Sequence, residues 1–289
     1  MLTLRRLALA TILVLAVAAC GGDDDTASPD PSSTADVSTT STTSEPSDTG
    51  EPSADTTELS TYFLDGDGHI RVGWVRSVDS TAVARGTLAE LLAGPGDGDE
   101  SMGLSTAIPE GTELIDVNVA GGIATVDLSD EFIGGDAADM PRRLAQIVYT
   151  VTQFPTVDEV EILVAGAVEA ESLTRADFQF GGTYEGIEPI VLVETPRPGE
   201  IVEGDIVAVG GFSNTFEAAV YIEIVTDDGE IVVPETYTMA TAGTGTTGVF
   251  QEMFEIPAGT GDVVARAYDL SGEDGVGRVG VTEVPFTRQ

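Results

Sequence analysis

The residue types that most often perform covalent or proton-transfer chemistry are scarce in this 289-residue chain: it has one cysteine, Cys20, and one histidine, His69. Cys20 comes directly after an apolar run over residues 7–19. Two arginines precede the run, and Gly-Gly-Asp follows Cys20. A basic start, an apolar core and small residues before a break are typical of a secretory signal peptide. We therefore expect residues 1–19 to be a signal peptide.

The four residues from Val17 to Cys20 resemble the bacterial lipobox, whose cysteine is lipidated and becomes the new N-terminus. The alternatives are an ordinary signal peptide with an unrelated cysteine, or an uncleaved anchor. The apolar run is shorter than the ~20 residues of a membrane span, and an exported protein with one odd cysteine would carry an unexplained thiol. We therefore expect Cys20 to carry an acyl chain such as palmitate, which would anchor the protein on the extracytoplasmic face of the cell membrane.

Acidic residues dominate the charge of the chain. It contains 50 Asp and Glu against 12 basic residues, for a formal net charge of −38. Such a surface repels nucleic acid and anionic lipid head groups, because both are bound by basic clusters. Two interpretations of the charge stay open, namely solubility in a salty habitat and binding of divalent cations or of a basic partner.

Two short acidic sequences place carboxylates on expected loops, where hard cations bind. They are Asp65-Gly66-Asp67-Gly68 and Asp97-Gly98-Asp99-Glu100. Neither matches the full EF-hand pattern, and Asp-Gly is also a common turn signal. Asp65, Asp67, Asp97 and Asp99 are therefore candidate metal ligands, with plain turns as the alternative.

The common catalytic constellations are absent from the sequence. No Gly-x-Ser-x-Gly elbow accompanies His69, so a surface turn histidine is a simpler interpretation than a Ser-His-Asp triad. A zinc site made of Cys and His ligands is excluded, because the chain has only one residue of each type. A P-loop is excluded because the chain has no lysine. Paired carboxylates could hydrolyse glycosides, but 50 acidic residues make any one pair uninformative. We expect no enzyme activity and no cofactor.

Two further features could contact a partner. Arg142 and Arg143 form an island of positive charge in an acidic region. They either pair with nearby Asp136 and Asp139 in solvent, or contact an anionic wall polymer or an acidic partner. Trp74, the only tryptophan, lies on an expected strand, where a core position is a commoner role than a binding platform.

The composition divides the rest of the chain into three parts. Residues 20–57 are rich in Ser, Thr, Asp and Pro and predict a disordered linker, because they cannot bury enough apolar surface to offset chain entropy. Residues 58–183 predict an α+β domain in the order β-β-α-β-β-α-β, with helices over 83–93 and 136–152 on one face of a sheet. The second helix should bury one face, made of Met140, Leu144, Ile147, Val148 and Val151, and Pro141 is tolerated in its first turn. A short joint is expected at 178–188.

In residues 188–289 the apolar residues no longer recur at helical spacing. This segment predicts an all-β immunoglobulin-like sandwich. About seven short apolar runs alternate with turn sequences such as Asp227-Asp228-Gly229. One run starts at Phe216, and five of its residues should share an inner face: Phe216, Ala218, Val220, Ile222 and Ile224.

Several short sequence segments within residues 58–183 resemble the GerMN domain of bacterial sporulation and spore-germination proteins. The matching segments are Leu91-Leu92-Ala93-Gly94-Pro95, residues 103–112, residues 124–129 with Glu131-Phe132, and residues 147–154. The second domain resembles the immunoglobulin-like domain that often follows GerMN, through residues 195–199 and 210–218. This resemblance implies an envelope protein without a defined catalytic site. Lipoproteins of this kind also look widespread in non-sporulating actinobacteria.

Together these features predict a non-enzymatic, lipid-anchored protein of the cell envelope, in which a GerMN-type module binds or assembles with other envelope proteins or with a cell-wall polymer. The alternative is an envelope enzyme, or a carbohydrate- or peptidoglycan-binding protein, that uses acidic residues.

Overall fold

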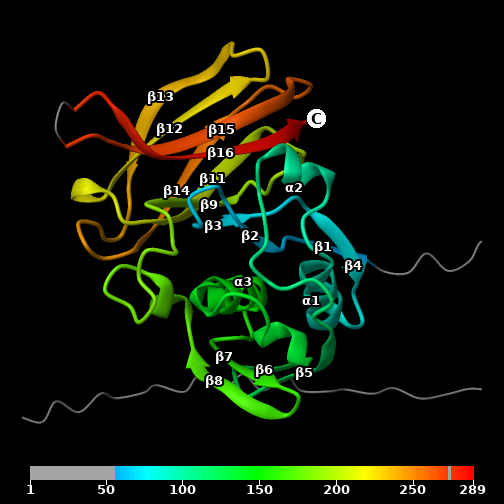
Figure 1. Cartoon of the computed structure of the whole chain (residues 1–289). Coiled ribbons are helices and arrows are strands. Elements are labelled where there is room, and N and C mark those ends of the chain that lie inside the picture. Colours follow the sequence, from blue (N-terminus) through cyan, green and yellow to red (C-terminus); the bar gives the residue numbers. More distant parts are fainter. Residues whose placement is uncertain (1–55, 273–274) are drawn as a thin grey trace, which may run out of the picture. The chain divides into compact units, whose positions relative to one another are not determined.

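The computed structural model describes residues 56–272 and 275–289, and these contain two clusters of buried apolar side chains (Figure 1). The predicted signal peptide, Cys20 and almost all of the predicted linker lie outside the described residues, so these expectations stay predictions. Within the described part of the chain, no helix combines the length and the apolar character needed to cross a membrane.

Strands and helices from residues 56–178 surround the first core. The strands are β1 (Thr56–Leu59), β2 (Tyr62–Leu64), β3 (Ile70–Val72), β4 (Arg76–Asp79), β5 (Leu114–Ala120), β6 (Ile123–Leu128), β7 (Glu159–Val164) and β8 (Ala167–Leu173). The helices are α1 (Val83–Ala93), α2 (Asp97–Ser101) and α3 (Met140–Val151), with short 3₁₀ helices η1 (Asp130–Ile133), η2 (Ala137–Asp139) and η3 (Arg175–Phe178).

The strands of this α+β domain form three sheets where the sequence predicted one layer. β5-β6-β7-β8 make a four-stranded sheet, whereas β1-β4 and β2-β3 are separate pairs. β6 and β7 run parallel, and the connection between them contains α3. Alternating residues of β6 are buried, and α1 and α3 lie on one side of the four-stranded sheet (Figure 1).

Helix α3 contributes six buried side chains to the first core. Of the five residues predicted on its buried face, four are buried, namely Leu144, Ile147, Val148 and Val151, and Met140 is partly buried. The helix is shorter than the predicted 136–152. Asp136 accepts a hydrogen bond from the backbone N–H of Ala138 at 2.9 Å, which caps the separate 3₁₀ helix η2, and α3 begins only afterwards.

The second core lies inside a β-sandwich, which confirms the immunoglobulin-like prediction. Its strands are β9 (Val191–Thr195), β10 (Ile201–Val202), β11 (Ile206–Ser213), β12 (Ala219–Thr226), β13 (Ile231–Met239), β14 (Gly248–Glu255), β15 (Gly261–Leu270) and β16 (Arg278–Arg288), with the 3₁₀ helix η4 (Phe216–Ala218) before β12. One sheet has the order β10-β16-β15-β12-β13, and the other has the order β14-β11-β9.

The run predicted as one strand from Phe216 begins later. Glu217 and Ala218 have φ angles of 55° and 61°, a left-handed conformation that a strand cannot contain. Phe216 is therefore on η4 and exposed, whereas Val220, Ile222 and Ile224 of β12 share the buried inner face.

Two local predictions in the first domain were wrong. The expected polar loop at 97–100 is helix α2, and Trp74 lies between β3 and β4, not on a strand. The indole of Trp74 lies against the backbone of Gly98 and of Gly199, where an added Cβ on Gly199 would come within 2.1 Å of the ring nitrogen. Gly199 also has a φ of 77°, so this contact between the two domains requires glycine.

The described residues, 56–272 and 275–289, belong to one compact unit. Leu192 of β9 packs in the first core although its strand belongs to the sandwich. The expected joint at 178–188 is also packed, because Phe178 and Ile187 are buried in the first core. The domain boundaries at 183 and 188 stay predictions, since no break between two separate bodies occurs there.

Candidate functional site

The turn between β2 and β3 is organised by Asp65. Its Oδ1 atom accepts backbone hydrogen bonds from Asp67 at 3.0 Å and from His69 at 2.9 Å. Gly68 follows with a φ of 83°, a conformation that glycine adopts without a steric penalty. The Asp-Gly-Asp-Gly sequence is therefore explained locally by a tight turn.

Arg71 joins this turn to the sandwich. Its guanidinium forms an ion pair with Asp65 Oδ2 at 2.9 Å and donates to the carbonyl of Val191 at 3.4 Å. Burial lowers the pKa of Arg71, and the charges of Asp65 and Asp67 oppose that shift. The hairpin thus carries a fixed positive group at the seam between the domains.

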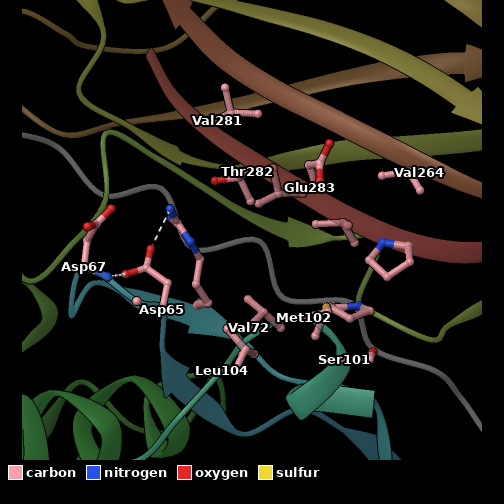
Figure 2. Close-up of a pocket in the computed structure, with 16 residues that line it drawn as sticks. Asp65, Asp67, Val72, Ser101, Met102, Leu104, Val264, Val281, Thr282 and Glu283 are labelled. Atoms are coloured by element: carbon pink, nitrogen blue, oxygen red, sulfur yellow. Dashed lines mark hydrogen bonds and ion pairs between the residues drawn. The ribbon is translucent and has the colours of Figure 1, made fainter. Parts of the chain in front are cut away.

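A cleft of about 440 Å³ opens beside this turn (Figure 2). One wall comes from Asp65, Asp67 and Arg71 together with Ser101 and Met102 near the end of α2. The facing wall is strand β16, through the segment 281–285, with Val264 of β15 beside it. Both domains therefore contribute to one cleft.

A second cavity of about 670 Å³ shares Asp67, Arg71 and Val281 with the first. Phe180 and Ile190 add exposed apolar surface to its lining. Glu188 also lines it and accepts hydrogen bonds from the hydroxyls of Tyr149 and Thr247, each at 2.9 Å. Burial raises the pKa of Glu188 above the ordinary range of a glutamate, against the opposing effect of its hydrogen bonds.

The predicted cation ligands do not form one site. One potential ligand atom each from Asp65, Asp67 and His69 lies within 4.8 Å of the others. Both carboxylate oxygens of Asp65 already have partners within the protein. One accepts hydrogen bonds from two backbone N–H groups, and the other is paired with Arg71. The fit to a metal ion is therefore poor at this turn.

Asp99 was a candidate metal ligand, but its two oxygens are bonded within the protein. It is fully buried, and both oxygens are bonded: Oδ1 accepts from the backbone of Trp74 at 2.6 Å, and Oδ2 accepts from Arg76 at 2.6 Å. Oδ2 also accepts from the backbone of Gly96 at 2.9 Å, at the start of α2. Asp99 is a structural residue, and the neighbouring Asp97 is exposed.

The two adjacent arginines of α3 differ. Arg143 is only 2% exposed and donates to the carbonyls of Ala107, Phe132 and Asp136, so its predicted contact with a partner is wrong. Arg142 is partly exposed and forms the expected pair with Asp139 at 3.4 Å. It also lines a shallow hollow of about 300 Å³ with Asp65 and Asp67.

A polar network between the domains was missed by sequence reasoning. Arg175 forms an ion pair with Glu194 at 2.7 Å and donates to the Thr152 hydroxyl at 2.8 Å. The hydroxyl of Tyr62 donates to the same oxygen of Glu194. The guanidinium also lies 4.8 Å from the ring centroid of Tyr149. No local pattern in the sequence could have revealed contacts between residues this far apart in the chain.

The groups around the cleft can be compared with what catalysis and binding need. His69 Nδ1 lies 3.5 Å from Asp65, but Asp65 is held by its other partners. The described residues contain no cysteine, so no thiol nucleophile faces the cleft. The walls offer an arginine, carboxylates, hydroxyls and apolar side chains, which together can hold a protein or polymer segment.

Comparisons with known proteins match two regions. Residues 60–169 match the Germane family, described as sporulation and spore germination. Residues 190–276 match the Gmad2 family, described as an immunoglobulin-like domain of bacterial spore germination. No curated protein matches the chain.

Among solved structures, the chain is similar to the first GerMN domain of the sporulation protein GerM from Bacillus subtilis. Identity is 22%, with 42% of this chain and 98% of that chain covered and a TM-score of 0.34. It is also similar to the tandem GerMN domains of the same protein, at 17% identity and a TM-score of 0.38. That match covers 70% of this chain and 62% of the tandem structure.

Proposed function

We propose that this protein is a non-enzymatic binding protein of the cell envelope. The proposal is supported by the matches to a GerMN-type Germane domain and to a Gmad2 immunoglobulin-like domain, which the sequence resemblance predicted. Lipid on Cys20 would hold it at the extracytoplasmic face of the membrane. The cleft between the domains would bind a segment of another envelope protein.

The observation that carries this proposal is the shared cleft. The Asp65–Arg71 hairpin and strand β16 face each other across it, and the ion pair of Arg175 with Glu194 links the same two domains elsewhere. A binding surface whose two walls are already held together loses little conformational freedom when a partner binds. Two domains docked in this way therefore suit recognition.

The cleft itself is tested by placing a charge in it. Val281 lines both cavities, so Val281→Glu should clash with a bound segment and add an unpaired carboxylate. Val249 is an exposed valine on β14 that lines neither cavity, which makes Val249→Glu the matched control. Crosslinking of the full chain in intact cells, followed by quantitative recovery of partners, is the measurement.

We expect Val281→Glu to reduce partner recovery by about tenfold or more, and Val249→Glu to leave it unchanged. Equal recovery with both variants would show that the cleft is not the binding surface. Recovery of the unmodified chain as a monomer under several detergents would refute the binding function as a whole.

The anchor has an independent test. Cys20→Ala should abolish incorporation of a labelled fatty acid and release the protein from the membrane fraction. If the variant remains membrane-bound and labelled, the lipid attachment is elsewhere or does not exist.

A further inference from the structure

Three tyrosines form a row across the outer face of the five-stranded sheet. Tyr237 of β13 and Tyr268 of β15 are both register partners of Tyr221 on β12. The ring centroids are 5.9 Å apart for Tyr237 and Tyr221, and 6.2 Å apart for Tyr221 and Tyr268. Directly paired residues on neighbouring strands point to the same side of a sheet, so the three rings share one face.

Exposure changes along this row. Tyr237 is 61% exposed at the edge strand, and Met239 beside it is exposed as well. Tyr268 is fully buried, with the guanidinium of Arg278 lying 4.4 Å from its ring centroid. The buried end is explained by packing within the sheet. The exposed end has no such explanation, because a ring left largely in water gains little from the fold.

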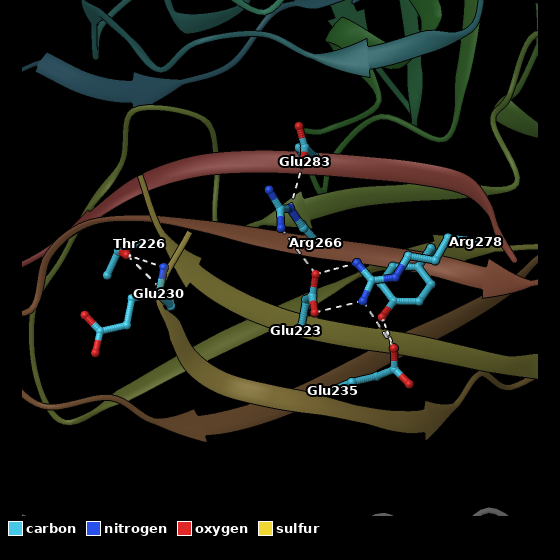
Figure 3. A network of polar contacts seen from close by, with 8 residues as sticks. Glu223, Thr226, Glu230, Glu235, Arg266, Arg278 and Glu283 are labelled. Carbon is cyan, nitrogen blue, oxygen red and sulfur yellow. Dashed lines mark hydrogen bonds and ion pairs between the residues drawn. The ribbon is translucent and has the colours of Figure 1, made fainter. Parts of the chain in front are cut away.

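The charged groups around the row are paired with one another (Figure 3). Arg278 donates to both oxygens of Glu223, at 2.5 and 3.0 Å, and to Glu235 at 3.3 Å. Arg266 bridges Glu223 at 3.4 Å and Glu283 at 2.7 Å. The hydrogen bond from Arg278 holds the pKa of Glu223 below its usual range.

This pairing makes the face unusual in a chain of net charge −38, because two arginines offset three glutamates here. An anionic or a cationic partner would gain little from a nearly balanced patch. The fixed donors and acceptors beside the rings, by contrast, can hydrogen-bond an uncharged ligand that carries both kinds of group.

We propose that this surface, the tyrosine face defined by Tyr221, Tyr237, Tyr268, Glu235 and Arg278, binds an uncharged polysaccharide chain. Sugar rings present apolar C–H faces that can lie on the exposed ring of Tyr237, and hydroxyls around their rims that can reach Glu235 and Arg278. β13 is an edge strand of this sheet, so a bound chain can extend past it. The inference rests on the proposed location in the cell envelope and adds a polymer contact to the protein contact of the cleft.

The test uses the full lipidated chain in detergent and isothermal titration with four probes. Chitohexaose and cellohexaose are uncharged glycans, polygalacturonate is an anionic one, and decaproline is a peptide that also docks on aromatic surfaces. We expect a neutral hexasaccharide to bind with a Kd of about 1 mM or tighter. Polygalacturonate should bind more weakly.

The variants separate binding from folding. Tyr237→Ala should weaken binding about tenfold, whereas Tyr237→Phe, which keeps the ring face, should stay within about threefold of the unmodified chain. Phe180→Ala is the matched control, because it removes another exposed aromatic ring that lies outside the tyrosine face. Unchanged thermal midpoints would show that the variants are folded.

Three outcomes would overturn the inference: no binding of either neutral glycan at about 10 mM, an equal loss with Phe180→Ala, or tighter binding of decaproline. The cleft variant Val281→Glu keeps the two hypotheses apart. If partner recovery depends on Val281 while no glycan binds, the tyrosine face fails and the proposed function stands.

Discussion

Two clusters in this protein use the same three side-chain types in different surroundings. At the domain seam, Arg175 contacts Glu194 and lies against the rings of Tyr62 and Tyr149. On the outer sheet face, Arg278 contacts Glu223 and Glu235 and lies against Tyr268 (Figure 3). Each combines an arginine–carboxylate pair with a cation–π contact to a buried tyrosine, so the exposure of the arginine is the main difference between them.

That difference separates a structural role from the proposed binding role. The side chain of Arg175 is 15% exposed, against 38% for Arg278. Burial, reinforced by the nearby carboxylates, raises the pKa of both Tyr62 and Tyr149 far above the ordinary range, so their hydroxyls remain donors. The seam is a closed network that holds two domains together, whereas the outer cluster keeps groups that can still meet a ligand.

The largest expected effect comes from opening the buried cluster. Arg175→Ala would leave Glu194 near the seam without its cation, and removal of one partner from a buried pair costs about 3–5 kcal/mol. Urea unfolding should show a midpoint shifted strongly to lower denaturant. Arg85→Ala is the control, because its pair with Asp116 is exposed on both sides and should contribute less than about 1 kcal/mol.

If Arg175→Ala unfolds with the same free energy as Arg85→Ala, the seam network is not what stabilises the docked domains. A change in the unfolding slope would point instead to separation of the domains before global unfolding.

A second, smaller effect should appear as a pH dependence from Glu188. Because burial raises its pKa in the folded state, the folded protein holds this proton more tightly than the unfolded chain does. The stabilisation is fully present below the ordinary glutamate pKa of about 4.3 and is lost as pH rises through the raised folded value. Glu188→Gln should therefore gain stability over the unmodified chain as pH rises from about 4 to about 7.

Unfolding free energies of the two proteins across this pH range provide the measurement. Glu185→Gln, at the rim of the same cavity, is the control and should give a nearly constant difference. A constant difference for Glu188→Gln as well would mean that the Glu188 carboxylate is solvated in the folded protein.

The same contrast explains what the sequence could and could not predict. The helical spacing of Leu144, Ile147 and Val148 and the alternation of Val220 and Ile222 are local patterns, and both predicted burial correctly. The seam pairs Tyr62 with a residue 132 positions away, a contact for which no local spacing exists. Among 50 acidic residues, nothing in composition could single out Glu194 or Glu188.

Position on an element also misled the prediction of site residues. Asp99 looked like an exposed loop ligand, but hydrogen bonding to the start of α2 and to Arg76 buries it. Arg143 is adjacent to Arg142, yet one step along a helix turns it by about 100°, from the surface towards the carbonyls beneath α3. Charge in a sequence does not reveal which side of an element carries it.

The smallest expected effect on stability comes from the outer cluster. Arg278→Ala should cost only about 1 kcal/mol, because Glu223 keeps its contact with Arg266, and the partly exposed Glu235 keeps its hydrogen bond from the Tyr268 hydroxyl. The loss should shrink further in high salt, which screens exposed pairs, whereas the effect of Arg175→Ala should change little. Urea unfolding of both variants at low and high salt measures the contrast directly. Equal costs for the two arginines, with equal salt dependence, would mean that the exposure of the arginine does not distinguish the clusters and that the tyrosine face is as closed as the seam.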